Sequence, residues 1–383
     1  MKCVLSVKWV IFAALLSGCP KQATFDLSIP DAPSVISAQP ADQVLVDASQ
    51  GSGPSIRSRA IALGIAVHEA DRATWAGRGS YDPDGWVQSQ TVDAMAPYAE
   101  EPAMRGVLAQ LATRDSADAY ARSHAAVVLA QTGGDDTVRD ALSAAVTQSR
   151  DPWNRSALAL GAMALGDTTH TGSLTDAVAR GDIALELTFI QDLGHTGNPS
   201  VLEALVAASD RVEEELVLAV AAARMLLGDD AGRSLLITAT NDDDPLVQLA
   251  VIDTVLDIPG NKPVLKAAMR SRDAIAGEYA ALAWDAVRDR VSDRFPRALE
   301  SDDPELRLAA LDLLGRTSSN PDLARDLARR ALLDDVPRVR AAAARRLGEL
   351  GLQAAAGDTE RLQVLLSDED ILVRVEAAGA LLR

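Results

Sequence analysis

One pattern of apolar and polar positions recurs along most of the chain. It is clearest at Leu306, Ala309, Ala310, Leu313 and Leu314, where apolar side chains fall at i, i+3, i+4, i+7 and i+8. This spacing places them on one face of an α-helix. An aspartate and a proline stand at positions 303 and 304, where a carboxylate can cap a helix and a proline can begin one. The pattern therefore predicts an amphipathic helix that starts at this Asp-Pro pair.

The same pattern occurs eleven times, with a mean spacing of about 32 residues, which is typical of helical-pair repeats. Shorter apolar-periodic segments lie between these helices, for example the one that carries Leu323, Leu327 and Ala331. Each repeat is therefore predicted to be two antiparallel helices. The predicted fold class is all-α, an α-solenoid of about eleven repeats that forms a curved superhelical rod on the order of 100 Å long. The first apolar position of each copy falls at Ile56, Val87, Ala121, Asn154, Leu185, Ala219, Val247, Gly277, Leu306, Val339 and Val373.

The pattern resembles a known repeat family. The aspartate before the second helix, the Val339-Arg340 pair and the alanine-rich run that ends at Leu347-Gly348 are similar to HEAT repeats, in particular their short bacterial variety related to bilin lyases. The resemblance covers roughly residues 54–383 and is strongest from 240 onward. It implies an Asp–Arg ladder between successive repeats, in which an arginine pairs with an aspartate six residues earlier. The pairs with that spacing are Asp334 with Arg340 and Asp368 with Arg374.

The second position of the pattern is arginine in six of the eleven copies, and the copies from 186 to 278 lack it. If the ladder sets stability, the middle third of the rod, roughly 180–290, is its softer part. Arg340→Ala is then costly and Gln248→Ala nearly silent. The six arginines are Arg57, Arg122, Arg155, Arg307, Arg340 and Arg374.

The N-terminus has the features of a signal peptide. Lys2 and Lys8 are followed by a short apolar run that ends at Leu16, far below the roughly 20 residues of a membrane span. The stretch 16–19, Leu-Ser-Gly-Cys, resembles a bacterial lipobox, which implies cleavage before Cys19 and acylation of its thiol. The alternative is an ordinary secretory cleavage site beside an unrelated cysteine. The predicted divisions are a lipoprotein signal peptide at 1–18, a lipidated, disordered tether at 19–54 and the repeat solenoid at 55–383.

A lipidated N-terminus predicts a location in the bacterial cell envelope, on the periplasm-facing side of a membrane. Pro20 follows the cysteine instead of the aspartate that marks inner-membrane retention in enteric bacteria, and this favours the outer membrane. The formal net charge of −18 excludes a nucleic-acid partner, because phosphate binding needs a basic surface.

No catalytic motif and no cofactor or metal signature is found in the sequence. HEAT-like di-iron hydroxylases carry several His-Glu dipeptides, and here only His68-Glu69 matches. His124 is interpreted as a hydrogen-bonding residue between helices. Three acidic clusters, around 82–84, 242–244 and 368–370, are interpreted as helix caps and not as calcium ligands. Trp86, Trp153 and Trp284 are expected to fill gaps between layers, and the alternative is an aromatic binding pocket.

Two surfaces are candidates for partners. The arginine-rich stretch 316–346 is either a solvated helix face or a docking surface for an acidic protein, and its candidate residues are Arg329, Arg330, Arg345 and Arg346. The last repeat helix, Val373 to Arg383, has no following helix pair. Its apolar stripe is therefore expected to stay open and to allow self-association.

These features favour a non-enzymatic, membrane-anchored envelope lipoprotein that acts as a protein–protein interaction scaffold for an unknown envelope partner. One alternative is a bilin-lyase-like or metal-dependent HEAT-repeat enzyme. Another is a purely structural envelope spacer. No sequence feature identifies the partner.

Overall fold

The computed structural model describes residues 40–51, 53–183, 185–212, 216–352 and 357–383. Over these residues the chain consists of the α-helices α1–α22 and one 3₁₀ helix (Ala96–Tyr98), with no strand. None of the helices in this part of the chain is long and apolar enough to cross a membrane. The all-α fold class predicted from the sequence is confirmed.

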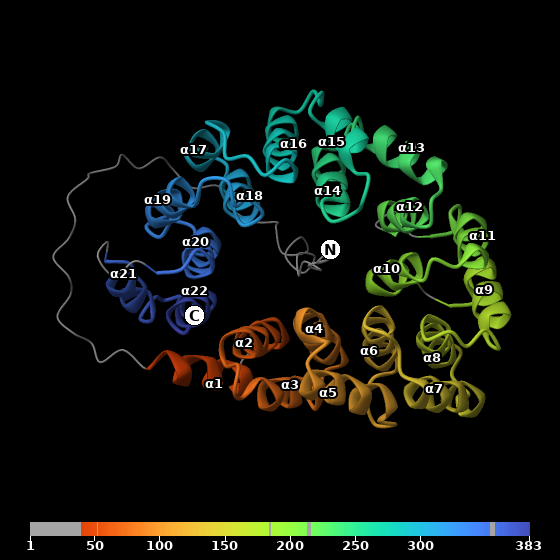
Figure 1. Ribbon diagram of the computed structural model, residues 1–383. Helices are drawn as coiled ribbons and strands as arrows, with labels where there is room; N and C mark the ends of the chain where they lie inside the picture. The colour runs from red at the N-terminus through yellow and green to blue at the C-terminus, as the bar shows by residue number, and fades with distance from the viewer. Residues whose placement is uncertain (1–39, 52, 184, 213–215, 353–356) are drawn as a thin grey trace.

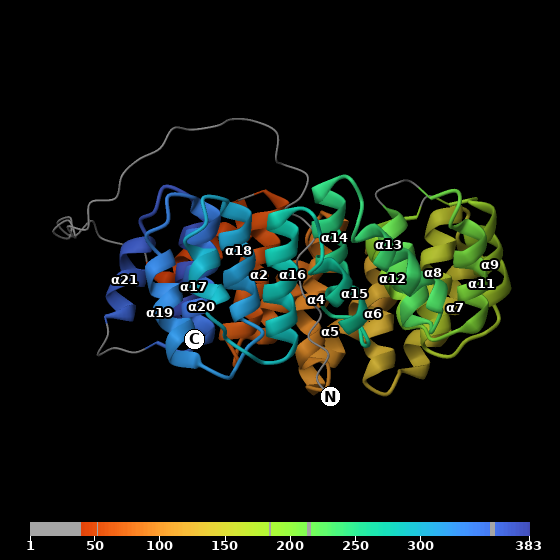
Figure 2. The same ribbon diagram turned by 90° about the horizontal axis from the view of Figure 1, so that it is seen from above.

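The helices form eleven antiparallel pairs, with one helix of each pair on the outer side and one on the inner side of the molecule (Figure 1). Figure 2 shows the helices roughly parallel to one another, running between the two faces of the molecule. The outer helices are α1 (Ala41–Gly51), α3 (Arg72–Ser80), α5 (Pro102–Thr113), α7 (Asp136–Gln148), α9 (Thr171–Arg180), α11 (Pro199–Ala208), α13 (Asp230–Ala239), α15 (Lys262–Ala268), α17 (Arg294–Leu299), α19 (Pro321–Ala331) and α21 (Asp358–Leu365). The inner helices are α2 (Pro54–Val67), α4 (Gly85–Met95), α6 (Ala119–Gln131), α8 (Pro152–Ala164), α10 (Leu187–His195), α12 (Val217–Leu226), α14 (Pro245–Val255), α16 (Ala274–Val287), α18 (Pro304–Leu314), α20 (Pro337–Glu349) and α22 (Ile371–Leu381).

The repeat positions read from the sequence coincide with the inner helices. Ten of the eleven first apolar positions lie near the start of an inner helix, and Leu185 lies two residues before α10. Aspartate side chains accept hydrogen bonds from first-turn amides in seven of these helices, as the capping interpretation predicted. The capping residues are Asp84, Asp118, Asp151, Asp244, Asp273, Asp303 and Asp370.

The pairs do not form an open rod. They close into a ring, because α22 packs against α1 and α2 (Figure 1). At this junction Glu376 of α22 forms a two-contact ion pair with Arg59 of α2. A Cβ added to Gly379 would lie 2.7 Å from Cδ2 of Leu63, so any larger residue there would displace the Leu63 side chain at this contact. Small rotations between successive repeats add up over eleven copies and return the chain to its start.

Ring closure corrects the prediction of an open C-terminal helix. Val373, Ala377 and Ala380 are at most 1% exposed. This part of the stripe is covered within the same chain, and Leu381 at its end is half-buried, so the open apolar face expected for self-association is not present. The sequence could not show this, because the covering helices lie more than 300 residues away.

The predicted tether also extends too far. Residues 41–51 form α1, and Val44, Leu45 and Ala48 are buried. These three residues span little more than one helical turn, too short for a periodic signal, and they are covered because α2 and α22 meet there. The folded ring therefore begins at about residue 41 and not at 55. The signal peptide and lipobox, with Cys19, lie outside the described residues.

Candidate functional site

Arginines at the second repeat position connect successive turns along one edge of the ring. Arg307 donates from Nε to Asp334 at 2.8 Å and from a terminal nitrogen to the same carboxylate at 2.8 Å. Its other terminal nitrogen donates to the main-chain oxygen of Ser301 at 2.9 Å. Arg57 contacts Asp82 of the following repeat in the same two-contact manner. Each of these arginines therefore connects its own turn to the next.

The Asp–Arg ladder is present, but its carboxylate pairs are shifted by one repeat from those implied by the resemblance. Arg340 donates to the main-chain oxygen of Asp334 at 2.9 Å, while its ion pair is with Asp368 of the next repeat, at 2.9 and 3.0 Å. Arg374 donates to the main-chain oxygen of Asp368 at 2.7 Å. The spacing of six residues therefore identifies a bond to the carbonyl. The carboxylate of the same aspartate instead pairs with the arginine of the preceding repeat, as Asp368 does with Arg340.

Glutamine replaces arginine at this position in two repeats and connects the same turns without charge. Gln248 is 5% exposed and donates to the main-chain oxygen of Asp242 at 2.5 Å. Its side-chain oxygen accepts a hydrogen bond from Ser271 of the next turn. Gln88 connects the carbonyl of Asp82 to the amide of Asp118 in the same way. The expectation that Gln248→Ala is nearly silent therefore rests on a wrong premise.

The predicted docking arginines do not form a free patch. Arg329 pairs with Asp326 and Asp358, Arg345 with Asp312, and the buried Arg346 with Glu349. Only Arg330 of the four is exposed without an ion pair among the described residues. In an acidic chain, most arginines near helix ends find an intramolecular carboxylate. Three of the four arginines therefore take part in ion pairs within the chain, and docking of an acidic partner on this stretch stays a prediction.

A buried polar cluster connects three inner helices at the bend of the ring. His124 of α6 lies 2.9 Å from Asp93 of α4 through Nε2 and 2.9 Å from Asp192 of α10 through Nδ1. The Tyr120 hydroxyl donates to Asp192 at 2.9 Å. Burial alone would lower the pKa of His124, but the two carboxylates outweigh it and hold that pKa well above its ordinary value. The interpretation of His124 as an inter-helix hydrogen-bonding residue is confirmed.

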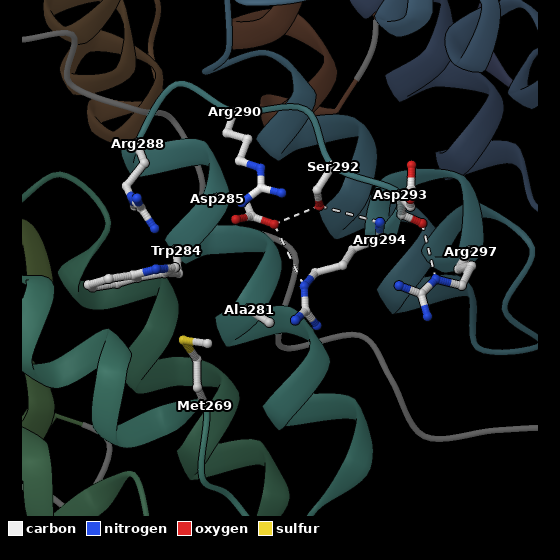
Figure 3. Close-up of a pocket in the computed structure, with 10 residues that line it drawn as sticks. All are labelled: Met269, Ala281, Trp284, Asp285, Arg288, Arg290, Ser292, Asp293, Arg294 and Arg297. Carbon is white, nitrogen blue, oxygen red and sulfur yellow. Dashed lines mark hydrogen bonds and ion pairs between the residues drawn. The ribbon is translucent and has the colours of Figure 1, made fainter.

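A pocket of about 350 Å³ lies where α16 ends and α17 begins (Figure 3). Trp284 and Met269 supply its apolar wall, and Met269 is 36% exposed. The guanidinium of Arg288 lies 5.8 Å from the centre of the Trp284 ring. Trp284 therefore packs against the hydrophobic core and also lines a recess, which fits the alternative of an aromatic binding pocket.

Four arginines surround this recess, and they differ in their partners. Arg294 lies 3.7 Å from the buried Asp285 and 3.3 Å from Glu278. Arg297 donates to a main-chain oxygen at 3.1 Å. Arg288 and Arg290 are exposed and have no carboxylate partner within the part of the chain that the structure describes.

The loop that carries Arg288 and Arg290 is fixed in place by the residue between them. Asp289 has a positive φ of 51°, a conformation that non-glycine residues rarely adopt. Its carboxylate accepts hydrogen bonds from the amide and hydroxyl of Ser318, at 2.6 and 2.8 Å, and from the amide of Ser319, at 3.1 Å. These bonds lower the pKa of Asp289 and connect the loop to the next repeat. These hydrogen bonds therefore hold Arg288 and Arg290 in place at the pocket.

Part of the chain matches a known family of repeats. Residues 291–382, from the loop before α17 to the end of α22, match the family model of HEAT repeats. This match supports a HEAT-repeat protein. No curated protein matches the chain.

The sequence predicted the HEAT-like repeats, and it offered a pocket at Trp284 only as an alternative and without the arginines that line it. Its arginines belong to different elements, since Arg288 and Arg290 lie in the loop after α16 and Arg294 and Arg297 lie on α17. The available signal was the density of arginines at 288–297 beside Trp284. A longer arginine-rich stretch at 316–346 was the stronger signal, and only contacts show that most of its arginines form ion pairs within the chain.

Proposed function

We propose that this protein is a lipid-anchored, non-enzymatic scaffold on the periplasmic side of a bacterial membrane, where its HEAT-like ring binds protein partners. HEAT repeats commonly mediate protein–protein interactions, and stacked helical repeats present extended binding surfaces. The observation that carries the proposal is the closed ring of eleven helix pairs. Closure holds the surfaces in one arrangement, so a partner binds without first ordering the scaffold.

The anchor rests on the N-terminal sequence. An apolar run ending at Leu16 is followed by Cys19 in a lipobox-like context, and Pro20 favours the outer membrane over the inner. Two or more acyl chains would hold the ring stably at a bilayer, whereas a single chain binds only marginally.

Cys19→Ser tests the anchor. Wild-type protein is expected in the membrane fraction and to be released by detergent. The Cys19→Ser protein is expected to be soluble or to remain unprocessed, because the acylated thiol is the proposed attachment. Processing at the normal site together with continued membrane fractionation would refute lipidation at this cysteine.

Cross-linking in intact cells tests the scaffold. A photo-reactive residue placed at exposed positions around the ring is expected to give discrete adducts with a small number of envelope proteins. A structural spacer would give no discrete adduct at any position, and that result would contradict the proposal. Substrate-dependent turnover by the purified protein would instead favour an enzyme.

A further inference from the structure

The pocket beside α16 gathers four arginines around one recess, in a chain whose formal net charge is −18. Acidic residues outnumber basic ones by 55 to 37, and most arginines at the repeat turns are paired with carboxylates. Yet Arg288 and Arg290 lie at the pocket without a carboxylate partner among the described residues. The one buried carboxylate nearby, Asp285, is occupied by the Ser292 hydroxyl at 2.6 Å and by Arg294. Asp293 also lines the pocket and is exposed, so four arginines stand against two carboxylates and the lining keeps a net positive charge.

The pocket combines this charge with an apolar wall. Figure 3 shows Arg288 above the Trp284 ring, Met269 below it, and Arg294 and Arg297 toward the other side of the pocket. A guanidinium group donates two parallel hydrogen bonds to a carboxylate, and an indole face packs well against an apolar side chain. The recess of about 350 Å³ is at the small end of ligand sites, enough for one or two side chains.

These features discriminate between anionic partners. A free phosphate would use the arginines and leave Trp284 and Met269 without a contact. A flat bilayer surface would reach the exposed Arg288 and Arg290 but not the recess between them and the indole. A peptide that carries a carboxylate next to an apolar side chain uses both parts of the pocket.

We propose that this pocket binds an acidic segment of a protein partner, with carboxylates on Arg288 and Arg290 and a neighbouring apolar side chain against Trp284. The inference deepens the scaffold function and rests on it, since it assigns the site and the chemistry by which the ring recognises its partner.

Fluorescence anisotropy with the detergent-solubilised full chain tests the pocket directly. The probe is a labelled peptide of alternating glutamate and leucine, and the reference is its glutamine–leucine counterpart. We expect Arg288→Ala and Arg290→Ala each to weaken binding of the acidic peptide about fivefold, and the double substitution about 25-fold. Arg330→Ala removes an exposed, unpaired arginine on α19 and is expected to leave binding unchanged.

Three results would overturn the inference. The first is that the glutamine peptide binds as tightly as the glutamate peptide. The second is that the protein with both substitutions binds the acidic peptide normally while circular dichroism shows that it is folded. The third is that inorganic phosphate displaces the peptide from wild type and a peptide of glycine and glutamate alone binds equally well. Binding of anionic phosphatidylglycerol vesicles through Arg288 and Arg290, with no peptide binding, would assign the site to a lipid surface and also refute it.

Cross-linking separates this inference from the scaffold proposal. If wild type gives discrete adducts and the Arg288→Ala/Arg290→Ala protein gives the same adducts in equal yield, the pocket inference fails and the scaffold stands. If wild type gives no adducts, the scaffold proposal fails, whatever the peptide does.

Discussion

Replacing Glu376 with glutamine is expected to loosen the ring at the contact between its two ends. Glu376 lies on α22 and is 3% exposed, and it accepts hydrogen bonds from Arg59 of α2 at 2.5 and 2.7 Å. Glutamine has nearly the same size but no charge. The substitution therefore removes the attraction between α2 and α22 and leaves their apolar packing in place.

The expected cost follows from the burial of the two partners. Removing one member of a fully buried ion pair costs about 3–5 kcal/mol, because the other charge is left uncompensated. The Arg59 side chain is 21% exposed, so water compensates part of its charge, and glutamine retains one hydrogen bond. We expect a loss of about 2 kcal/mol in the free energy of local opening, which is roughly a 30-fold increase in the population of the open junction.

Native-state hydrogen exchange measures this opening helix by helix. The amides of α1, α2 and α22 are expected to lose protection in the Glu376→Gln protein, whereas those of α8 and α12 are unchanged. Glu305→Gln is the matched control, since Glu305 pairs with Arg338 between α18 and α20 with side chains that are 34% and 29% exposed. An exposed pair of this kind is worth at most about 1 kcal/mol.

The pH dependence has a defined sign. Burial alone would raise the pKa of Glu376, but Arg59 and Arg345 outweigh burial and hold it below the ordinary value of 4.5. A carboxyl with a depressed folded pKa stabilises the closed ring above its unfolded pKa, and this contribution is lost as the pH falls through the folded pKa. Wild type is therefore expected to lose protection at the junction in acid, and Glu376→Gln is expected to lack this step.

Two results would refute the reasoning. Equal protection of α22 in wild type and Glu376→Gln near neutral pH would show that the ion pair does not hold the junction. Low protection of α1 and α22 already in wild type would show that the ring is open in solution.

Three further substitutions test the connections between repeats. Gln248→Ala is expected to cost about 1–2 kcal/mol in stability, because it leaves buried polar groups without partners. Arg340→Ala is expected to cost about 2–3 kcal/mol, because it also removes the ion pair of Asp368. Hydrogen exchange of α14 and α20 measures both costs, and unchanged exchange in Gln248→Ala would contradict the bridging role of this glutamine. His124→Gln is expected to cost about 3 kcal/mol and to expose α10 amides. In wild type the pKa of His124 is raised, so its stabilisation is complete below the unfolded pKa and is lost as the pH rises through the folded pKa. Protection factors of α10 amides that do not fall as the pH rises into the alkaline range would contradict this.

The repeat architecture could be predicted because each inner helix carries its own signal. An aspartate cap and a one-faced apolar stripe are local features, and both recur at the start of α18 and α22. The ladder was predicted with the correct residues and the wrong partners. Arg340 is six residues from Asp334, but its carboxylate partner Asp368 is 28 residues away, and sequence spacing alone does not distinguish a bond to a carbonyl from one to a side chain.

Closure and the pocket were beyond the sequence for a different reason. Whether Glu376 meets Arg59 depends on the summed rotation of all the repeats between them, to which every turn contributes a small amount. Likewise, the arginines of the pocket come from the loop after α16 and from α17, and only the folded chain brings them around the recess beside Trp284. Ring closure and the composition of the pocket both depend on contacts between segments that are apart in the sequence, and no single segment carries a signal for either.

Closure also makes distant repeats depend on one another. In an open solenoid a change in one repeat alters its neighbours, and the free ends move without cost. In a ring the rotations must still bring α22 back to α2, so a change at one bend has to be absorbed by the others or strain the junction. The bend at α10 is held by Asp192, which accepts bonds from both Tyr120 and His124 of α6, and it lies across the ring from the junction (Figure 1). The buried cluster at α10 and the ion pair between Arg59 and Glu376 therefore both fix the curvature of the ring, although they lie at opposite positions in it.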